Sequence, residues 1–193
     1  HVPEADAQTL LEEAVRVDDW GYTRREDFHR WWCARVAGHG ARISPQEFWE
    51  DFRTHLADHV RPIPGLQEVL EELATHHELV LVSNGGGPNQ RAKLAAAHLT
   101  ELFAPERILI SGELGIWKPA PAIFEQALAR VDLPPQDGVM IGDDLVRDIA
   151  GARPLGLRTC WVRHGRTLPG DAPATPDHVI ARIHELAEWE WLR

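Results

Sequence analysis

Three aspartates stand close together in the stretch GVMIGDDLVRDIAGA, residues 138–152. Asp143 and Asp144 directly follow an apolar run that ends at Gly142, and Asp148 comes four positions after Asp144. Carboxylates this close repel one another, and removing them from water is costly unless positive charge compensates. The pattern therefore indicates a bound cation, or chemistry that needs several carboxylates in one place.

Two other segments carry groups that suit an anion beside such a cation. Ser83 and Asn84 follow the apolar run LVLV and precede three glycines, residues 85–87. The Ser83 hydroxyl and the N–H groups that follow it can donate hydrogen bonds to phosphoryl oxygens, and glycine lets the backbone approach closely. Lys118, in GIWKPAPAIF, supplies positive charge for both a phosphate and the carboxylates. Mg²⁺ suits this set, since it takes one or two protein carboxylates and leaves its other positions to water and substrate oxygens.

The chain beyond about residue 61 alternates between apolar strands and helices. The expected strands are ELVLV, RILI, GVMIG, RTCWV and a short HVI, and the expected helices are LQEVLEELATHH, PNQRAKLAAAHL, PAIFEQALARV, LVRDIAGARPLG and ARIHELAEWEWL. Apolar strands that alternate with helices predict an α/β fold, a Rossmann-like parallel sheet with helices on both faces. Ligands bind such a sheet at the carboxyl ends of its strands, where Ser83 and Asp143 stand.

The first part of the chain predicts an N-terminal all-helical module over residues 1–61, which leaves residues 62–193 as the α/β domain. One helix is expected from about Asp6 to Asp18. A second is expected in TRREDFHRWWCARVAGHG, where Thr23 and Glu26 have the spacing of a capping box. A third is expected in SPQEFWEDFRTHLADHV, with Ser44 as the cap, Pro45 at the first helical position and Glu47 completing the box.

Composition narrows the class of function. The 193 residues carry a formal net charge of −10, which disfavours binding to nucleic acid or to an anionic membrane surface. No apolar run approaches the ~20 residues that a membrane span needs. Cys33 and Cys160 are too few and too far apart for a disulfide framework, so we expect a cytoplasmic protein.

Each candidate residue also has an ordinary structural explanation. Asp143 or Asp144 could simply cap the helix that begins at Leu145, Ser83–Asn84 could form a turn, and Lys118 could be a surface lysine. His55 and His59 lie one helical turn apart, a spacing that can hold zinc, but no third ligand is apparent. Two adjacent acids and a third in the next turn exceed what a cap requires. The order of the motifs therefore carries the functional prediction.

That order resembles the haloacid dehalogenase (HAD) superfamily, whose members are mostly Mg²⁺-dependent phosphatases. LVLVSN resembles its second motif, a strand ending in Ser or Thr that binds phosphate, and WKPAPAIF resembles its third, with a lysine before a proline. VMIGDDLVRDIAGA resembles its fourth motif, a strand ending in metal-binding acids. PIPGLQEVLEEL is similar to the segment that re-enters the core domain in members with a helical cap, and the resemblance covers roughly residues 60–165.

The resemblance implies a Mg²⁺-dependent phosphohydrolase that acts on a small phosphorylated metabolite through a phospho-aspartyl intermediate. It implies that Lys118 and Ser83 are catalytic and that both also bind substrate, together with Asn84 and Gly85. Asp143 and Asp144 are the implied Mg²⁺ ligands. Asp148 is expected behind them, close to Lys118.

One part of the family pattern is missing from the sequence. The first motif is Asp-x-Asp at the end of the central strand, and it supplies the nucleophile and the general acid/base. Glu4 and Asp6 have a similar spacing, but they read as the start of a helix. We therefore expect a segment before His1 to carry this strand, with residues 1–61 as the cap. The alternatives are a non-catalytic relative that binds phosphate and metal, or a 2-haloacid dehalogenase, which works without the metal. The sequence identifies neither the substrate nor the oligomeric state.

Overall fold

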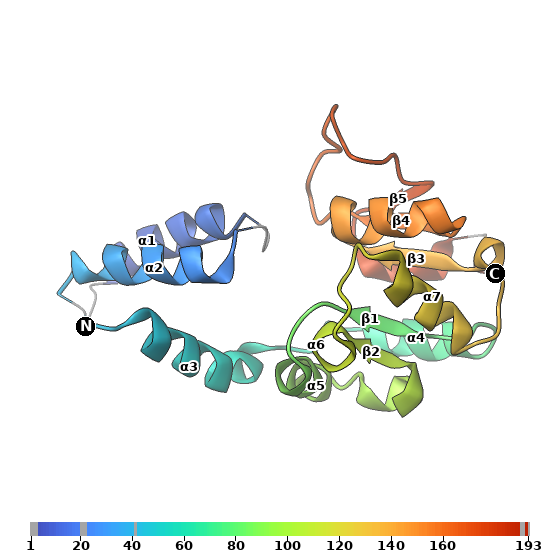
Figure 1. Ribbon diagram of the computed structural model, residues 1–193, viewed down its shortest axis with the longest axis horizontal. Coiled ribbons are helices and arrows are strands. Elements are labelled where there is room, and N and C mark those ends of the chain that lie inside the picture. Colours follow the sequence, from blue (N-terminus) through green and yellow to red (C-terminus); the bar gives the residue numbers. More distant parts are fainter. Residues whose placement is uncertain (1–3, 20–22, 41, 190–191, 193) are drawn as a thin grey trace. The chain divides into compact units, whose positions relative to one another are not determined.

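A computed structural model describes residues 4–19, 23–40, 42–189 and 192. The chain divides into two compact units, His1–His59 and Val60–Arg193, shown in Figure 1. The first unit is all-helical and the second holds every strand of the described residues. None of the helices in these residues combines the length and the apolar character needed to cross a membrane.

The helical unit contains α1 (Glu4–Asp18), α2 (Arg25–Ala37), α3 (Pro45–His55) and a short 3₁₀ helix (Leu56–His59). The capping box predicted at the start of α3 is confirmed. Glu47 N donates to Ser44 Oγ over 3.2 Å, and Ser44 N donates to Glu47 Oε2 over 2.8 Å. Each bond satisfies a backbone N–H that the helix itself leaves unpaired.

The capping box predicted for α2 is wrong. Arg24 is the residue before α2, and no side chain caps the helix there. Thr23 instead donates its hydroxyl hydrogen to the backbone carbonyl of Val17, near the end of α1. The last carbonyls of a helix lack intrahelical partners, and this acceptor competes for the hydroxyl that the sequence pattern assigns to α2.

Aromatic rings of α2 and α3 form the interior of the helical unit. His29 is buried and stacks on Trp49 with 5.0 Å between ring centroids, and it meets Phe48 edge-on at 5.3 Å. Burial lowers the pKa of His29, with a smaller contribution from the positive charge of Arg25. These ring contacts join α2 to α3.

The α/β unit follows the predicted alternation. In chain order its main elements are α4 (Leu66–Ala74), β1 (Leu81–Ser83), α5 (Gly87–Ala96), β2 (Ile108–Ile110), α6 (Ser111–Leu114), α7 (Pro121–Ala129), β3 (Val139–Gly142), the π-helix η6 (Leu145–Ala150), β4 (Arg158–Val162), β5 (His178–Ile180) and the 3₁₀ helix η8 (Ile183–Glu188). Short 3₁₀ turns occupy Thr100–Leu102, Pro105–Arg107, Pro135–Asp137 and Arg153–Leu155.

All strand pairs in this unit are parallel, which confirms the predicted Rossmann-like α/β class. β1 pairs with β2, with Ser83 beside Ile110. β3 pairs with β4, with Gly142 beside Trp161, and β4 pairs with β5. The strands form two ladders, β1–β2 and β3–β4–β5, rather than the single sheet expected from the sequence. Among the described residues no ladder joins β1 to β3.

Helices pack against both faces of these strands. On one face, Leu73 of α4 and Leu186 of η8 join Cys160 and Val162 of β4 in one core cluster. On the other face, Phe124 of α7 packs with Val82 and Met140. Neighbouring strand residues point to opposite faces, so both faces of a parallel sheet need apolar side chains. This explains why the strands read as unbroken apolar runs.

An apolar groove of about 450 Å³ lies between the two ladders, lined by residues of α4, α7, β1, β3 and the C-terminal segment. β1 and β3 flank it and are only partly buried, whereas β2 is buried throughout and β4 over all but its first residue. In a parallel sheet covered on both faces, inner strands are normally the more buried ones. The partial exposure of β1 and β3 therefore follows from the groove between them.

The last predicted helix is mostly wrong. ARIHELAEWEWL was expected as an α-helix, but only Ile183–Glu188 is helical within the described residues, and it is a 3₁₀ helix. The carboxylate of Glu185 accepts hydrogen bonds from the N–H groups of Ala181 and Arg182, which fixes the start of the turn. His184 also shares a 2.8 Å contact between its Nε2 and the Pro64 carbonyl. These local and long-range bonds hold the segment in its tighter form.

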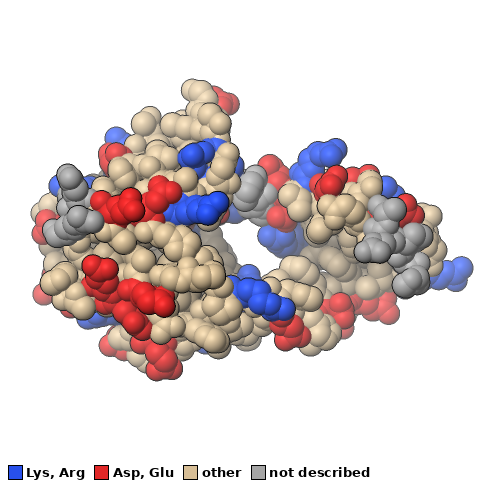
Figure 2. Space-filling model, turned by 180° about the vertical axis from the view of Figure 1, so that it is seen from behind, with Lys and Arg blue, Asp and Glu red and all other residues tan. Residues whose placement is uncertain are grey.

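The charge distribution matches the acidic composition. Figure 2 shows Asp and Glu side chains gathered in groups on one face of the α/β unit, with separate Lys and Arg side chains around them.

The α3 capping box makes a direct prediction. Replacing Ser44 by Ala should lower the stability of the helical unit by about 1 kcal/mol, because the Glu47 N–H loses its acceptor. Urea unfolding followed by tryptophan fluorescence measures this loss. Gln46→Ala is the matched control, since Gln46 is exposed in the same turn and contacts only Glu50 among the contacts seen. Equal stability of S44A and Q46A would contradict the prediction.

Candidate active site

The lysine that the sequence singles out is buried at the carboxyl ends of β1 and β3. The Nζ atom of Lys118 lies 2.7 Å from Asp148 Oδ1 and donates to the Val82 carbonyl over 2.9 Å. The side chains of Lys118 and Asp148 are only 11% and 5% exposed. Burial raises the pKa of Asp148, while the Lys118 charge and the Asp144 N–H oppose that rise. Lys118 is therefore not the surface lysine of the ordinary explanation.

Asn84 fixes the backbone of that lysine. Asn84 Oδ1 accepts from Lys118 N, and Asn84 Nδ2 donates to the Lys118 carbonyl, both over 2.9 Å. The side-chain amide of Asn84 thus bonds to both the N–H and the carbonyl of Lys118, as the backbone of a neighbouring strand would. We expected Asn84 to contact substrate directly, and the structure shows it holding Lys118.

Ser83 ends β1, Gly85 follows two residues later, and both are bonded to other side chains. The hydroxyl of Ser83 accepts a hydrogen bond from Gln90 Nε2, and the same amide nitrogen donates to the Asn84 carbonyl over 3.0 Å. Gly85 N donates to Ser111 Oγ over 2.9 Å. Among the described residues no acceptor is seen for the Ser83 hydroxyl hydrogen. The Gly85 N–H, expected to meet phosphate, is bound to Ser111.

Asp144 performs the capping role that the ordinary explanation assigns to it. Its Oδ1 accepts from Val146 N over 2.9 Å and from Arg147 N over 2.7 Å. Its Oδ2 lies 3.0 Å from Arg147 Nη1, and the side chain is 14% exposed. Both carboxylate oxygens of Asp144 are thus already bound within the chain.

Asp143 is arranged differently from its neighbour. Its carboxylate is 54% exposed, and its closest cation, Arg166, lies 3.7 Å away. Its backbone carbonyl accepts from Trp161 Nε1 over 3.0 Å and from Arg166 Nη2 over 2.6 Å. The backbone is therefore held while the carboxylate faces outward. Of the two predicted metal ligands, Asp143 is the one with a carboxylate available to an added cation.

Each of the three acids has its own cation in the folded chain. Lys118 compensates Asp148, Arg147 compensates Asp144, and Arg166 lies nearest to Asp143. Arg147 follows Asp144 by three residues, so its pairing could have been read from helical spacing. Arg166 and Trp161 were missed because the parallel register of β3 and β4 brings Trp161 to Asp143, and the turn after β4 brings Arg166 there.

A π-turn aims Asp148 back at the strand end. Ile149 N donates to the Asp144 carbonyl over 3.2 Å, a bond that spans five residues. Asp148 Oδ2 then accepts from Asp144 N over 3.1 Å. A side chain on Gly142 would collide with this carboxylate, because its Cβ would lie 2.6 Å from the Cβ of Asp148. Glycine before the acid pair is therefore a packing requirement.

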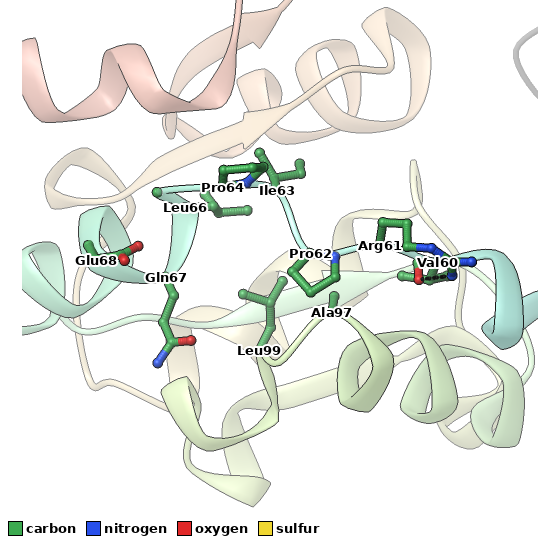
Figure 3. A pocket seen from close by; sticks show the side chains of 11 residues that line it. Val60, Arg61, Pro62, Ile63, Pro64, Leu66, Gln67, Glu68, Ala97 and Leu99 are labelled. Atoms are coloured by element: carbon green, nitrogen blue, oxygen red, sulfur yellow. Dashed lines mark hydrogen bonds between the residues drawn. The ribbon is translucent and has the colours of Figure 1, made fainter.

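Other candidate sites carry less chemistry. A pocket of about 350 Å³ lies beside the segment Val60–Gly65, where it meets the start of α4 and the end of α5 (Figure 3). None of the strand-end residues lines it, and its Arg61 donates to the adjacent Val60 carbonyl. His55 pairs with Asp51. Across the residues the structure describes, no group of three or more His, Cys, Asp or Glu side chains gathers as a metal site.

Comparison with known proteins agrees with this geometry. A family model described as HAD-hydrolase-like matches residues 116–186, which include Lys118 and all three aspartates. The chain is 40% identical over 108 residues to a phosphoserine phosphatase of Thermus thermophilus, covering 56% of this chain and 42% of that protein. It is 30% identical over 159 residues to the pyrimidine 5'-nucleotidase YjjG of Escherichia coli, covering 81% of this chain and 67% of that protein. The chain belongs to the HAD-like hydrolase family.

Solved structures support the fold of this HAD-like chain. The HAD-hydrolase YfnB of Bacillus subtilis, described as bound to magnesium, superposes with a TM-score of 0.77 at 24% identity, over 96% of this chain and 81% of that one. A 2-haloacid dehalogenase of Pseudomonas syringae gives a TM-score of 0.60 at 27% identity, over 97% and 80%. The chain covers less than half of the length of the phosphoserine phosphatase.

The residues of the HAD-like site fit a magnesium ion. Asp143 presents a hard oxygen donor that is half exposed at the end of a parallel strand. One or two protein carboxylates suffice for Mg²⁺, because water and phosphate oxygens complete its shell. A cage of three protein ligands is not needed.

The close packing at Gly142 predicts a large effect of a small change. Gly142→Ala should cost about 1–3 kcal/mol of stability, because the new methyl group must displace the buried Asp148. Thermal or urea unfolding measures the loss. Gly170→Ala is the matched control, since a Cβ there meets nothing within 4 Å. A G142A chain as stable as G170A would show that the Asp148 carboxylate is not held as described.

Burial of the Lys118–Asp148 pair predicts a pH-dependent defect. Lys118→Met leaves Asp148 buried without its cation and should cost about 3–5 kcal/mol near neutral pH. The Asp148 pKa then rises further, so the folded chain binds more protons than the unfolded one. The stability difference from the parent should therefore widen as pH rises from ~4, the ordinary aspartate value, to the raised pKa.

Unfolding of K118M and of the double variant K118M/D148N between pH 4 and pH 8 measures this effect. The double variant should recover part of the lost stability and lose the pH dependence, because no buried carboxylate remains. A pH-independent K118M defect would contradict the burial of a charged pair.

Proposed function

We propose that this chain is the phosphate- and metal-binding part of a Mg²⁺-dependent phosphohydrolase that acts on a small phosphorylated metabolite. One observation carries the proposal. The Lys118 ammonium binds the Val82 carbonyl at the end of β1 and the Asp148 carboxylate after β3, at the edge where parallel α/β sheets bind ligands. Ser83 is the last residue of β1, and the exposed Asp143 directly follows β3. Relatives named as phosphatases support it.

Each residue has a distinct part in this proposal. The Ser83 hydroxyl donates to a phosphoryl oxygen, and the Lys118 ammonium offsets the charge that develops on the phosphoryl group. Asp143 would hold the magnesium ion, which supplies positive charge beside the phosphate. Asn84 and Asp148 keep Lys118 in place through the contacts described above. Gly85 gives the backbone room at the end of β1.

The nucleophile requires one more strand. We propose that the inter-ladder groove accepts a parallel strand ending in Asp-x-Asp, as the family resemblance implies, and that the helical unit acts as a cap. The groove is apolar, and the strands on its two sides are only partly buried. The first aspartate would attack phosphorus as the bond to the leaving oxygen breaks, and the second would protonate that oxygen. Water would then hydrolyse the phospho-aspartyl group.

The substrate class stays broad in this proposal. The similar relatives are named for phosphoserine, glyceraldehyde 3-phosphate and pyrimidine nucleotides, which share a phosphate monoester and little else. A 2-haloacid dehalogenase is among the structural neighbours. Dehalogenases of the superfamily work without a metal, and the outward carboxylate of Asp143 favours the phosphatase.

The test is a screen of the native protein, with its termini established by intact mass, against p-nitrophenyl phosphate, phosphoserine and nucleoside monophosphates. We expect phosphate release that EDTA abolishes and Mg²⁺ restores. Metal-independent release of chloride from 2-chloropropionate would instead identify a dehalogenase. Binding of Mg²⁺ and phosphate without turnover would identify a non-catalytic relative.

The two adjacent aspartates should differ in their effect on metal binding. Asp143→Asn should weaken Mg²⁺ binding at least tenfold, because it removes the exposed carboxylate. Asp144→Asn is the matched control, since asparagine caps a helix as well as aspartate does and both Asp144 oxygens are already bound. Isothermal titration calorimetry compares the two. A larger loss in D144N than in D143N would reverse the assignment of the ligand.

A further inference from the structure

The backbone of Asp143 is held by two side chains from the neighbouring strand and the turn that follows it. Its carbonyl oxygen accepts from the indole N–H of Trp161 over 3.0 Å and from the guanidinium of Arg166 over 2.6 Å. Trp161 is 1% exposed and belongs to β4, directly beside Gly142 in the parallel register. Two donors on one carbonyl fix the orientation of the peptide between Asp143 and Asp144.

A tight turn brings Arg166 to this position. Arg166 N donates to the Arg163 carbonyl over 2.8 Å, and the two residues between them have positive φ angles, 47° at His164 and 80° at Gly165. The chain reverses direction at this turn, so the Arg166 side chain lies beside the end of β4. Arg166 Nε donates to the Arg163 carbonyl over 3.0 Å, and its guanidinium lies 5.4 Å from the centre of the Trp161 ring. The planar fork of arginine satisfies several of these contacts at once.

The ion pair between Arg166 and the Asp143 carboxylate is the weaker part of this arrangement. The two groups are 3.7 Å apart, and the carboxylate is 54% exposed. Exposed pairs of this kind contribute little, whereas hydrogen bonds from a charged donor are among the stronger ones. The contact that matters is therefore the one to the backbone carbonyl, which leaves the carboxylate turned outward.

We propose that Arg166 and Trp161 are positioning residues that hold the Asp143 peptide so that its carboxylate is preorganised for the divalent cation. The inference rests on the proposed function, because it assigns a role toward the Mg²⁺ of that site. Neither side chain touches the substrate in this account. Both act through Asp143, by limiting the rotation of its backbone.

Arg166→Lys is the most informative variant. Lysine keeps the positive charge but lacks the planar fork in which Nε binds the Arg163 carbonyl and Nη2 binds the Asp143 carbonyl. Trp161→Phe is the second variant, since it removes the N–H donor and keeps a ring in the buried site. Arg163→Lys is the matched control, because Arg163 lies in the same turn and only its backbone is used in these bonds.

Two measurements on the native protein test the inference. Titration calorimetry should show Mg²⁺ binding three- to tenfold weaker in R166K and W161F than in R163K and the parent. Without metal, amide hydrogen exchange at Asp144 should be about tenfold faster in R166K and W161F, with Ile141 in the β3 ladder unchanged. The second readout needs no activity and no bound ion.

The outcomes separate this inference from the proposed function. A parent protein that binds no Mg²⁺ would refute the proposed function and this inference with it. If R166K and W161F bind Mg²⁺ as tightly as the parent does, the inference alone is refuted. Weaker binding with unchanged exchange at Asp144 would also refute it, because the two side chains would then not act by holding the Asp143 peptide.

Discussion

The ammonium group of Lys118 joins the two ladders of the α/β unit where their strands end. It donates to the Val82 carbonyl at the end of β1 and pairs with Asp148, whose other oxygen is bonded to the backbone that follows β3. β1 and β3 share no ladder hydrogen bonds in the described residues. A buried pair of this kind is costly to form, and it persists only when further hydrogen bonds satisfy both partners. The side chain of Asn84 holds the backbone of Lys118, the π-turn directs Asp148 to the end of β3, and Gly142 leaves room for its carboxylate.

The acids of the strand end are consequently not equivalent. Asp148 is buried and neutralised by a lysine, and Asp144 is bound to the start of the following helix. Only Asp143 combines a fixed backbone with an exposed carboxylate. Three neighbouring carboxylates are tolerable because each is matched by a cation of the chain. As a result, the Asp143 carboxylate faces outward while the Lys118 ammonium is held at the strand ends.

The sequence predicted the positions of the strands and that Ser83 and the acid pair stand at their carboxyl ends, because apolar runs followed by glycine and small polar residues indicate both burial and chain reversal. It also predicted the capping box at Ser44, a signal contained within four residues. The box at Thr23 and the C-terminal helix were wrong, and in both segments a side chain binds a distant part of the chain: Thr23 binds the Val17 carbonyl and His184 the Pro64 carbonyl. The roles of Arg166, Trp161 and Ser111 depend on strand register and close approach between segments, which periodicity does not encode.

The central claim is that the carboxyl ends of β1 and β3 form the phosphate and metal site. A crystal structure of the native protein grown with Mg²⁺ and inorganic phosphate tests it most directly. The account predicts the phosphate between the Ser83 hydroxyl and the Lys118 ammonium, with the magnesium ion bound to Asp143. Phosphate bound elsewhere, with Lys118 still enclosed by Val82 and Asp148 and no metal on Asp143, would contradict it.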